Sequence, residues 1–224
     1  MFKELVSFFK GKNLIDEAFK ESLTMLEKDC EMFKAVKESL RHSDSAEIKC
    51  DVFKHDKLIN KYEREVRKKV LINLSVTGST FLNAGLVLVS IVIDIERIGD
   101  YTKNIAELAK HHPQRLVAGS YEETIKKIET IVENKFPAVI EALRNSDEKI
   151  AREKMEEHKE VSSTCDEILF SLIKEKDKNI TPSEAVTIAL YTRYLKRINS
   201  HLTNIATSIV NPFDRIGFYT KVED

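Results

Sequence analysis

Apolar residues recur at intervals of three and four along most of the chain, which is the spacing of a helix with one buried face. From Leu86 to Ile93 the sequence is apolar on all sides, as in a helix packed against several neighbours. The pattern therefore predicts six long helices. The third is expected over residues 80–110. The apolar positions of the other five are Ile15, Phe19, Leu26, Phe33, Val36 and Leu40; Ile48, Val52, Ile59, Tyr62, Val66 and Val70; Ile125, Ile128, Val132, Phe136, Val139 and Leu143; Ile150, Val161, Cys165, Ile168 and Leu172; and Ile188, Tyr191, Leu195, Ile198, Leu202, Ile205 and Ile209.

Several helix ends are marked by residues of the expected type. A first helical turn has free amides that a side-chain oxygen can cap, and a proline cannot continue a helix. The expected starts are Asn13 and Asp44 as single caps, and Ser120 with Glu123 and Thr181 with Glu184 as capping boxes. The expected stops are Pro113 and Pro212, and Pro137 is expected to kink the fourth helix.

The chain contains an internal repeat. Residues 96–106 read ERIGDYTKNIA and residues 196–206 read KRINSHLTNIA, each late in the last helix of one half. Six helices with short links fold most simply as bundles of antiparallel neighbours. We therefore expect an all-α fold of six long helices in two tandem antiparallel three-helix bundles, over residues 1–111 and 112–224.

Composition excludes several other classes of protein. Six Gly and four Pro among 224 residues are too few for the many turns of an all-β fold. The 36 basic and 37 acidic residues nearly cancel, so the net charge gives no indication of a nucleic-acid partner. Cys30, Cys50 and Cys165 have neither the even number of a disulfide framework nor a CxxC spacing, which favours free thiols in a reducing compartment.

One stretch is apolar enough to suggest a membrane span. Residues 70–93 carry no charge, and their number would cross a bilayer. The hydroxyl-rich and glycine-containing segment 75–80 favours a turn between two bundle helices instead. The N-terminal MFKELVSFFKGK lacks the apolar core and cleavage site of a signal peptide, so we expect a cytoplasmic protein.

Acidic residues on two helices have a spacing that suggests a metal site. Glu96 and Asp100 are four residues apart, so their carboxylates leave one face of a helix and repel each other. Asp56, Asn60 and Glu63 likewise share one face of the second helix. If the two helices pack antiparallel, these side chains can form an oxygen-rich pocket suited to a hard or borderline divalent cation. The alternative is that they are ordinary solvated charges, with Arg97 and Lys103 as neighbours.

The motif that contains Glu96 and Asp100 is similar to a known signature. ERIGDYTKNIA resembles the E(D)xxxD signature of the PhoU family, which has the form RIGDHAxNIA in the last helix of each three-helix repeat. The likeness extends over the six-helix count, the duplication and the opening FFKGKNLIDEAFKESLTML. It implies that Glu96 with Asp100, and Asp56 with Asn60 and nearby Glu63, hold metal ions. Asn60 stands where the family has an acid and still offers an oxygen ligand.

The second repeat departs from the metal-binding pattern. Lys196 and Ser200 stand at the positions of the acidic pair, and His158 and Ser162 stand at the positions of its partners. A lysine supplies its own cation and repels another, so we expect no cluster of this type in the second half. His158 and His201 could form a small nitrogen site, although a lone helical histidine is more often structural.

The resemblance also implies a function. PhoU-like proteins are cytoplasmic adaptors that link a phosphate ABC transporter to a sensor histidine kinase, and they are not enzymes. We expect such a regulator here, reaching the membrane only through its partners, with a possible homodimer and no nucleic acid. Oxygen ligands would accept iron, zinc, manganese, magnesium or calcium.

Two alternatives remain at this point. The first is a PhoU-like interaction scaffold that binds no metal in either half. The second is a carboxylate-bridged di-metal enzyme, which usually needs Glu-x-x-His ligand pairs that this sequence lacks.

Overall fold

The computed structural model describes residues 13–45, 47–112 and 114–218, and these residues form helices and short connections without a strand. Three short 3₁₀ segments, η1 (Gly78–Phe81), η2 (Gly119–Tyr121) and η3 (Phe213–Arg215), lie at turns. The expected all-α fold of six long helices is therefore confirmed. The helices are α2 (Leu14–His42), α3 (Val52–Thr77), α4 (Leu82–His111), α5 (Glu122–Asn145), α6 (Glu148–Ile173) and α7 (Pro182–Val210).

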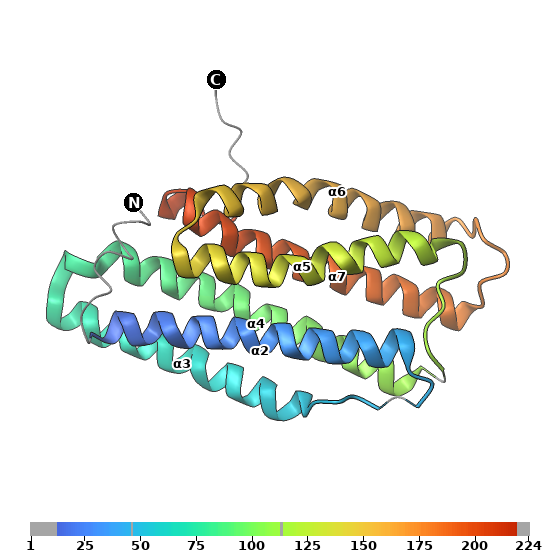
Figure 1. Ribbon diagram of the computed structural model, residues 1–224, viewed down its shortest axis with the longest axis horizontal. Helices are drawn as coiled ribbons and strands as arrows, with labels where there is room; N and C mark the ends of the chain where they lie inside the picture. Colours follow the sequence, from blue (N-terminus) through green and yellow to red (C-terminus); the bar gives the residue numbers. More distant parts are fainter. Residues whose placement is uncertain (1–12, 46, 113, 219–224) are drawn as a thin grey trace, which may run out of the picture.

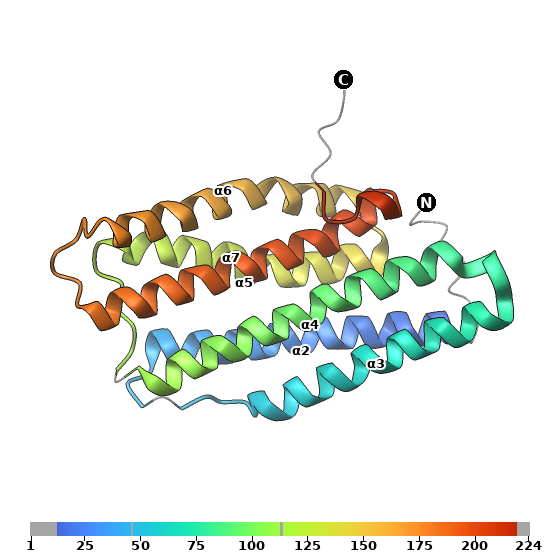
Figure 2. The same ribbon diagram turned by 180° about the vertical axis from the view of Figure 1, so that it is seen from behind.

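The six helices form two antiparallel three-helix bundles that lie side by side along the long axis of the molecule (Figure 1). One bundle contains α2, α3 and α4, and the other contains α5, α6 and α7. The bundles meet through α2 against α5 and α4 against α7, while α3 and α6 lie at opposite outer edges (Figures 1 and 2). At the centre, Phe33 and Phe136 come from matching helices of the two repeats, with ring centroids 5.4 Å apart. The two tandem bundles predicted from the repeat are confirmed.

The predicted central helix is only partly enclosed. α4 packs against α2, α3 and α7, and its Ile91, Val92 and Ile95 are buried. Leu86 and Ile93, however, remain 37% and 40% exposed. The expectation that this segment is covered on all sides was wrong, because none of the helices formed by the described residues covers these two side chains.

Two of the predicted helix caps are confirmed. The Asn13 side chain accepts a hydrogen bond from the Asp16 amide at the start of α2. Thr181 and Glu184 form a reciprocal capping box at the start of α7, with Pro182 in the first turn. These side chains satisfy amides that have no partner within the helix.

The other two predicted caps were wrong. α3 begins after Asp51, which caps Lys54, so Ile48 precedes the helix and Asp44 instead accepts a hydrogen bond from the Arg115 amide. α5 begins after Tyr121 with no side-chain cap. The segment before α5 is a 3₁₀ turn, and the amide of Ser120 donates to Asp177. A different local residue therefore caps α3, whereas α5 begins without a side-chain cap.

The prolines have different effects on their helices. α7 ends at Val210, two residues before Pro212, as expected. α5 continues past Pro137 to Asn145. α4 ends at His111, and Pro113 lies outside the described residues.

The long apolar stretch folds back on itself within the first bundle. Taken together, Val52–His111 is long and apolar enough to cross a membrane by length and composition, and one third of its most apolar window is buried. The stretch is interrupted at Gly78, whose φ of 63° places it in the left-handed region that favours glycine. The predicted turn is therefore present, and α3 and α4 pack antiparallel.

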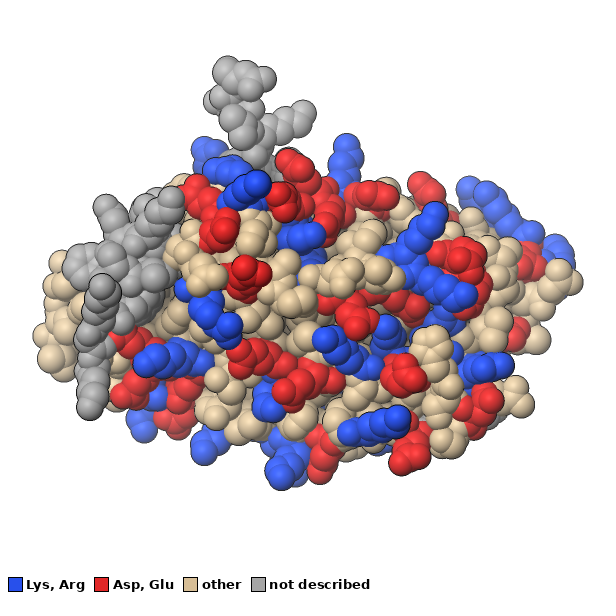
Figure 3. All heavy atoms as spheres, in the orientation of Figure 1, with Lys and Arg blue, Asp and Glu red and all other residues tan. Residues whose placement is uncertain are grey.

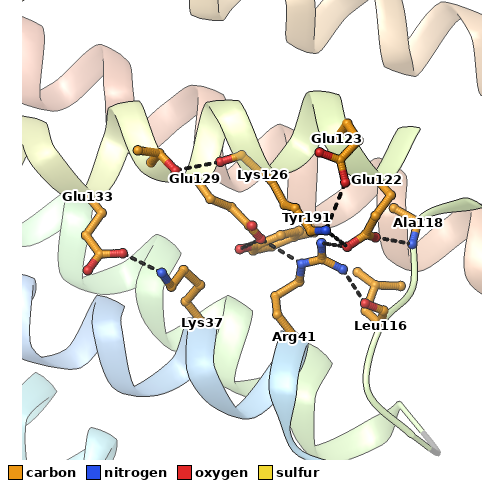
Figure 4. A network of polar contacts seen from close by, with 11 residues as sticks. Lys37, Arg41, Leu116, Ala118, Glu122, Glu123, Lys126, Glu129, Glu133 and Tyr191 are labelled. Carbon is orange, nitrogen blue, oxygen red and sulfur yellow. Dashed lines mark hydrogen bonds and ion pairs between the residues drawn. The ribbon is translucent and has the colours of Figure 1, made fainter. Parts of the chain in front are cut away.

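A network around Arg41 joins the two repeats (Figure 4). The buried Arg41 side chain on α2 donates to Glu129 Oε1 at 2.7 Å and Glu122 Oε1 at 2.8 Å, both on α5. It also donates to the carbonyl oxygen of Leu116, in the link between the repeats. Tyr191 on α7 donates to the same Glu129 oxygen at 2.7 Å. A single buried guanidinium therefore contacts both the second bundle and the connecting segment.

Candidate metal site in the first repeat

The antiparallel packing of α3 and α4 brings the two predicted acidic faces together. Lys103 Nζ lies 2.9 Å from Asp56 Oδ1 on α3 and 3.2 Å from Asp100 Oδ1 on α4. One cation therefore bridges the two helices between predicted ligands. Burial lowers the pKa of Lys103, but its hydrogen bonds to Asp56 and Asp100 outweigh burial and raise that pKa above its ordinary value.

Arg97 neutralises the outer side of the acidic pair. Its Nη1 lies 3.2 Å from Asp100 Oδ2, and its Nε lies 3.7 Å from Glu96 Oε2. Burial raises the pKa of Glu96, and the neighbouring charge of Asp100 raises it further. The charged form of Glu96 is thus disfavoured by its surroundings, and a further cation would stabilise it.

Asp29 on α2 belongs to the same cluster and was not among the predicted ligands. Its side chain is buried, and neither carboxylate oxygen has a hydrogen-bond partner among the described residues. Burial raises the pKa of Asp29 well above its ordinary value, and the charges of Glu96, Asp56 and Asp100 add to this effect. An unpartnered buried carboxylate costs several kcal/mol unless it is protonated or faces a cation. The sequence signal for Asp29 is an acid within the apolar stripe, between Leu26 and Phe33.

Gly99 explains how Asp29 can approach α4. A Cβ atom at this position would lie 2.9 Å from Asp29 Oδ1 and 3.4 Å from Ile59 Cδ1. The glycine between Glu96 and Asp100 therefore leaves space for the buried carboxylate beside the acidic pair.

The remaining predicted ligands lie on α3. Glu63 accepts from Arg67 Nη2 at 2.8 Å and contributes to the raised pKa of Glu96. Asn60 is half-buried on the same helix, one turn after Asp56. Asp56, Glu63 and Asp100 are therefore close enough to Glu96 to affect its pKa, and Asp29 lies beneath the pair of helices.

The donor chemistry of this cluster fits a hard cation, although the side chains are arranged around an ammonium group. Carboxylate oxygens predominate, and two of them have no partner at Asp29. Within the described ranges, however, no three Asp, Glu, His or Cys side chains are placed so that they could hold a metal ion as they stand. Lys103 bridges the gap between Asp56 and Asp100. Metal binding at these residues stays a prediction.

The corresponding region of the second repeat contains a buried lysine. Lys135 on α5 is fully buried, and its Nζ donates to Asn199 Oδ1 at 2.8 Å and Thr203 Oγ1 at 2.9 Å. Burial lowers the pKa of Lys135 to about 7. Lys196 pairs with both carboxylate oxygens of Asp166 at 2.6 Å. The second repeat therefore has the amino groups of Lys135 and Lys196 in the region where the first repeat has carboxylates.

The two histidines of the second repeat have separate partners. His158 Nδ1 lies 3.2 Å from Asn199 Nδ2 and 3.3 Å from Thr203 Oγ1. His201 Nδ1 lies 2.7 Å from Asp94 Oδ1 on α4, and its ring stacks on Tyr101. The alternative of a shared nitrogen site was wrong for these described side chains, because His201 contributes to the contact between the repeats and His158 lies within the second bundle.

The three free cysteines agree with the sequence analysis. Cys30, Cys50 and Cys165 are unpaired. Burial raises the pKa of Cys165 to about 12, which makes it an inert thiol.

The duplicated three-helix bundle, with an acidic pair late in the third helix of one repeat, defines the class of the protein. A family profile of the PhoU domain matches the chain twice, over residues 22–109 and 125–209. The chain therefore belongs to the PhoU family.

Solved structures agree with this fold. PhoU from Pseudomonas aeruginosa is 20% identical, with a TM-score of 0.78 over 88% of this chain and 95% of the other. The phosphate transport system regulatory protein PhoU from Streptococcus pneumoniae is 16% identical, with a TM-score of 0.69 over 88% and 91%. No curated protein matches the chain.

Proposed function

We propose that this protein is a cytoplasmic regulator of phosphate transport that links a phosphate ABC transporter to a sensor histidine kinase. The observation that carries the proposal is membership of the PhoU family over both repeats. A structurally similar protein bears the name phosphate transport system regulatory protein. An elongated molecule with α3 and α6 at opposite edges suits an adaptor that binds two partners at once (Figure 1).

The first repeat is proposed to take up a metal ion at its acidic cluster. Asp29, Asp56, Glu96 and Asp100 provide oxygen donors, with Asn60 and Glu63 beside them. Burial, and after it the repulsion between carboxylates, raises the pKa values of Asp29 and Glu96, and a bound cation would offset both effects. Binding would require Lys103 to swing away from Asp56 and Asp100, which its flexible side chain permits.

A metal-free interaction scaffold is the second candidate. It is favoured by the Lys103 ammonium group, which already bridges the two acidic faces. In that case the charges of the cluster are neutralised from within the chain.

We further infer that the protein acts by binding and does not catalyse a reaction. The sequence has no Glu-x-x-His pair of the kind that supports a di-metal enzyme in a helical bundle. The di-metal enzyme therefore ranks below both binding functions.

One purification tests the regulator and its metal together. The tagged chain is recovered from phosphate-replete cells of its own host without chelator or metal-affinity resin. Bound metal is measured by inductively coupled plasma mass spectrometry, and co-purified proteins are identified by peptide mass spectrometry. We expect a near-stoichiometric metal ion, together with subunits of a phosphate transporter and a histidine kinase.

Two matched variants separate the outcomes. Glu96→Gln with Asp100→Asn should lose the metal, whereas Glu156→Gln with Glu160→Gln should retain it, because it removes an exposed acidic pair of the same spacing from α6. Partners recovered without metal would favour the scaffold. Recovery of neither the transporter nor the kinase would contradict the regulator itself.

A further inference from the structure

The outer face of α3 is basic, and its exposed charged side chains do not belong to the acidic cluster described above. All the charged residues in the exposed class on this helix are basic: Lys54, Lys57, Lys61, Arg64, Arg67 and Lys68. Among them, only Arg67 forms an ion pair with a described residue, Glu63. The acidic side chains of α3 turn toward α4 or lie half-buried. The exposed face therefore carries a single sign of charge.

Helical spacing places these bases in one stripe with apolar side chains beyond them. Lys57, Lys61, Arg64 and Lys68 follow one another at intervals of four and three, and Leu71 continues the series. Leu71 is 68% exposed, and Ile72, on the same face, is exposed as well. From the first base to the last leucine the stripe is about 20 Å long, at 1.5 Å per residue.

The end of the stripe is an exposed apolar tip at the turn between α3 and α4. Val76 is 81% exposed, and Leu82 and Leu86 are exposed on the other side of the turn. No acidic residue occurs in the sequence between Glu65 and Asp94. The tip belongs to the apolar stretch of which only one third is buried in its most apolar window.

The matching helix of the second repeat lacks this charge pattern. The exposed charged residues of α6 are of both signs: Lys149, Arg152, Glu153, Glu156, Lys159, Glu160 and Glu167. Positive and negative side chains are also intermingled over the face formed by α2, α5 and α6 (Figure 3). Bundle architecture alone therefore does not produce the basic stripe on α3.

We propose that the outer face of α3 and the α3–α4 tip form a docking surface for an anionic membrane. These residues would contact the lipid directly. Lysine and arginine are attracted to acidic headgroups, and exposed Leu and Val side chains can enter the interfacial region. Among the long helices of the described residues, α3 packs mainly against α2 and α4, and it lies at the outer edge of the two bundles (Figures 1 and 2). The exposed bases and Leu71 on this outer face are therefore accessible to a flat surface. The proposal does not depend on the identity of the regulator's protein partners.

Vesicle flotation of the full-length chain tests this surface. Phosphatidylcholine vesicles with phosphatidylglycerol should carry the protein upward, vesicles of phosphatidylcholine alone should not, and added salt should weaken binding. Replacing Lys57, Lys61, Arg64 and Lys68 by glutamine should reduce the partition coefficient at least about tenfold. The exposed positions leave the fold intact, which circular dichroism verifies. Equal binding by the wild type and this variant would overturn the proposal.

A matched variant on α6 and a variant of the tip complete the test. Replacing Lys149, Arg152 and Lys159 by glutamine should leave vesicle binding unchanged. Leu71→Ser with Val76→Ser should weaken it about tenfold, because apolar area no longer enters the interface. The proposal is wrong if the wild type does not bind anionic vesicles and light scattering shows it as a dimer but the tip variant as a monomer. The surface is then an interface between copies of the chain.

Discussion

The buried side chain of Asp29 changes how the neighbouring carboxylates Glu96 and Asp100 are interpreted. Glu96 and Asp100 could be solvated charges on a helix surface, with Arg97 and Lys103 as neutralising partners. The unpartnered carboxylate of Asp29 beneath them makes the same half-buried residues part of an acidic cluster with a buried member. Its raised pKa follows from burial first and from the surrounding carboxylates second.

The buried Lys135 makes a testable contribution to stability. Its pKa is about 7 in the folded protein, against an ordinary value of 10.5. Below pH 7 the folded protein must bury the ammonium form, and this cost disappears as the pH rises from 7 toward 10.5. We expect Lys135→Met to stabilise the protein by about 1–4 kcal/mol at pH 6, with the gain shrinking toward pH 10.

Urea denaturation at several pH values measures this effect. Lys159→Met, at an exposed position on α6, is the control and should show no comparable change with pH. A stability difference for Lys135→Met that is the same at pH 6 and pH 10 would show that the lysine is charged throughout.

At the scale of single helices, the caps show which of the capping motifs predicted from the sequence form in the folded chain. The Thr181 and Ser120 motifs have the same spacing, yet only the first forms a capping box. Asp177 accepts from the Ser120 amide, and the turn before α5 is a 3₁₀ segment. A cap motif is therefore necessary for a capping box but does not ensure one.

This difference predicts unequal effects of two similar substitutions. Thr181→Ala should lower the free energy of unfolding by about 1 kcal/mol, because the first turn of α7 loses its acceptor. Ser120→Ala should change it by less than about 0.5 kcal/mol, since the side chain does not cap α5. Thermal unfolding followed by circular dichroism compares the two, and equal losses would indicate a capping role for Ser120.

At the scale of the whole molecule, polar contacts between the repeats specify how the two bundles meet. Arg41 bonds to Glu129, Glu122 and the link, and His201 and Asn204 on α7 both bond to Asp94 on α4. Such buried and partly buried polar contacts require defined positions of both bundles, whereas apolar packing tolerates small shifts.

Arg41 should therefore contribute far more than an exposed ion pair between the same helices. Arg41→Ala leaves Glu129 buried without its cation, and we expect a loss of about 3–5 kcal/mol. Arg144 pairs with Glu27 at 2.6 Å across the same two helices, but both side chains are largely exposed. Arg144→Ala should cost less than about 1 kcal/mol. Urea titrations that gave equal losses would contradict a special role for the buried network.

Part of the candidate site could be predicted before the fold was known. Four-residue spacing places Glu96 with Asp100 on one face, and the apolar stripe of each helix indicates that α3 and α4 pack together. Two features could not be predicted in the same way. The Lys103 bridge depends on how α3 and α4 are rotated against each other, and the place of Asp29 as a buried neighbour depends on the depth and rotation of α2 relative to α4.

The sequence by itself determined the six helices, their duplication, two caps and the turn at Gly78, because periodicity, local hydrogen bonding and glycine conformation act over a few residues. Only the tertiary structure decided that Asp29 joins the acidic cluster, that Ser120 leaves α5 uncapped and that Arg41 connects the repeats. These outcomes depend on residues far apart in the chain, whose burial and charge interactions exist only once the helices have packed.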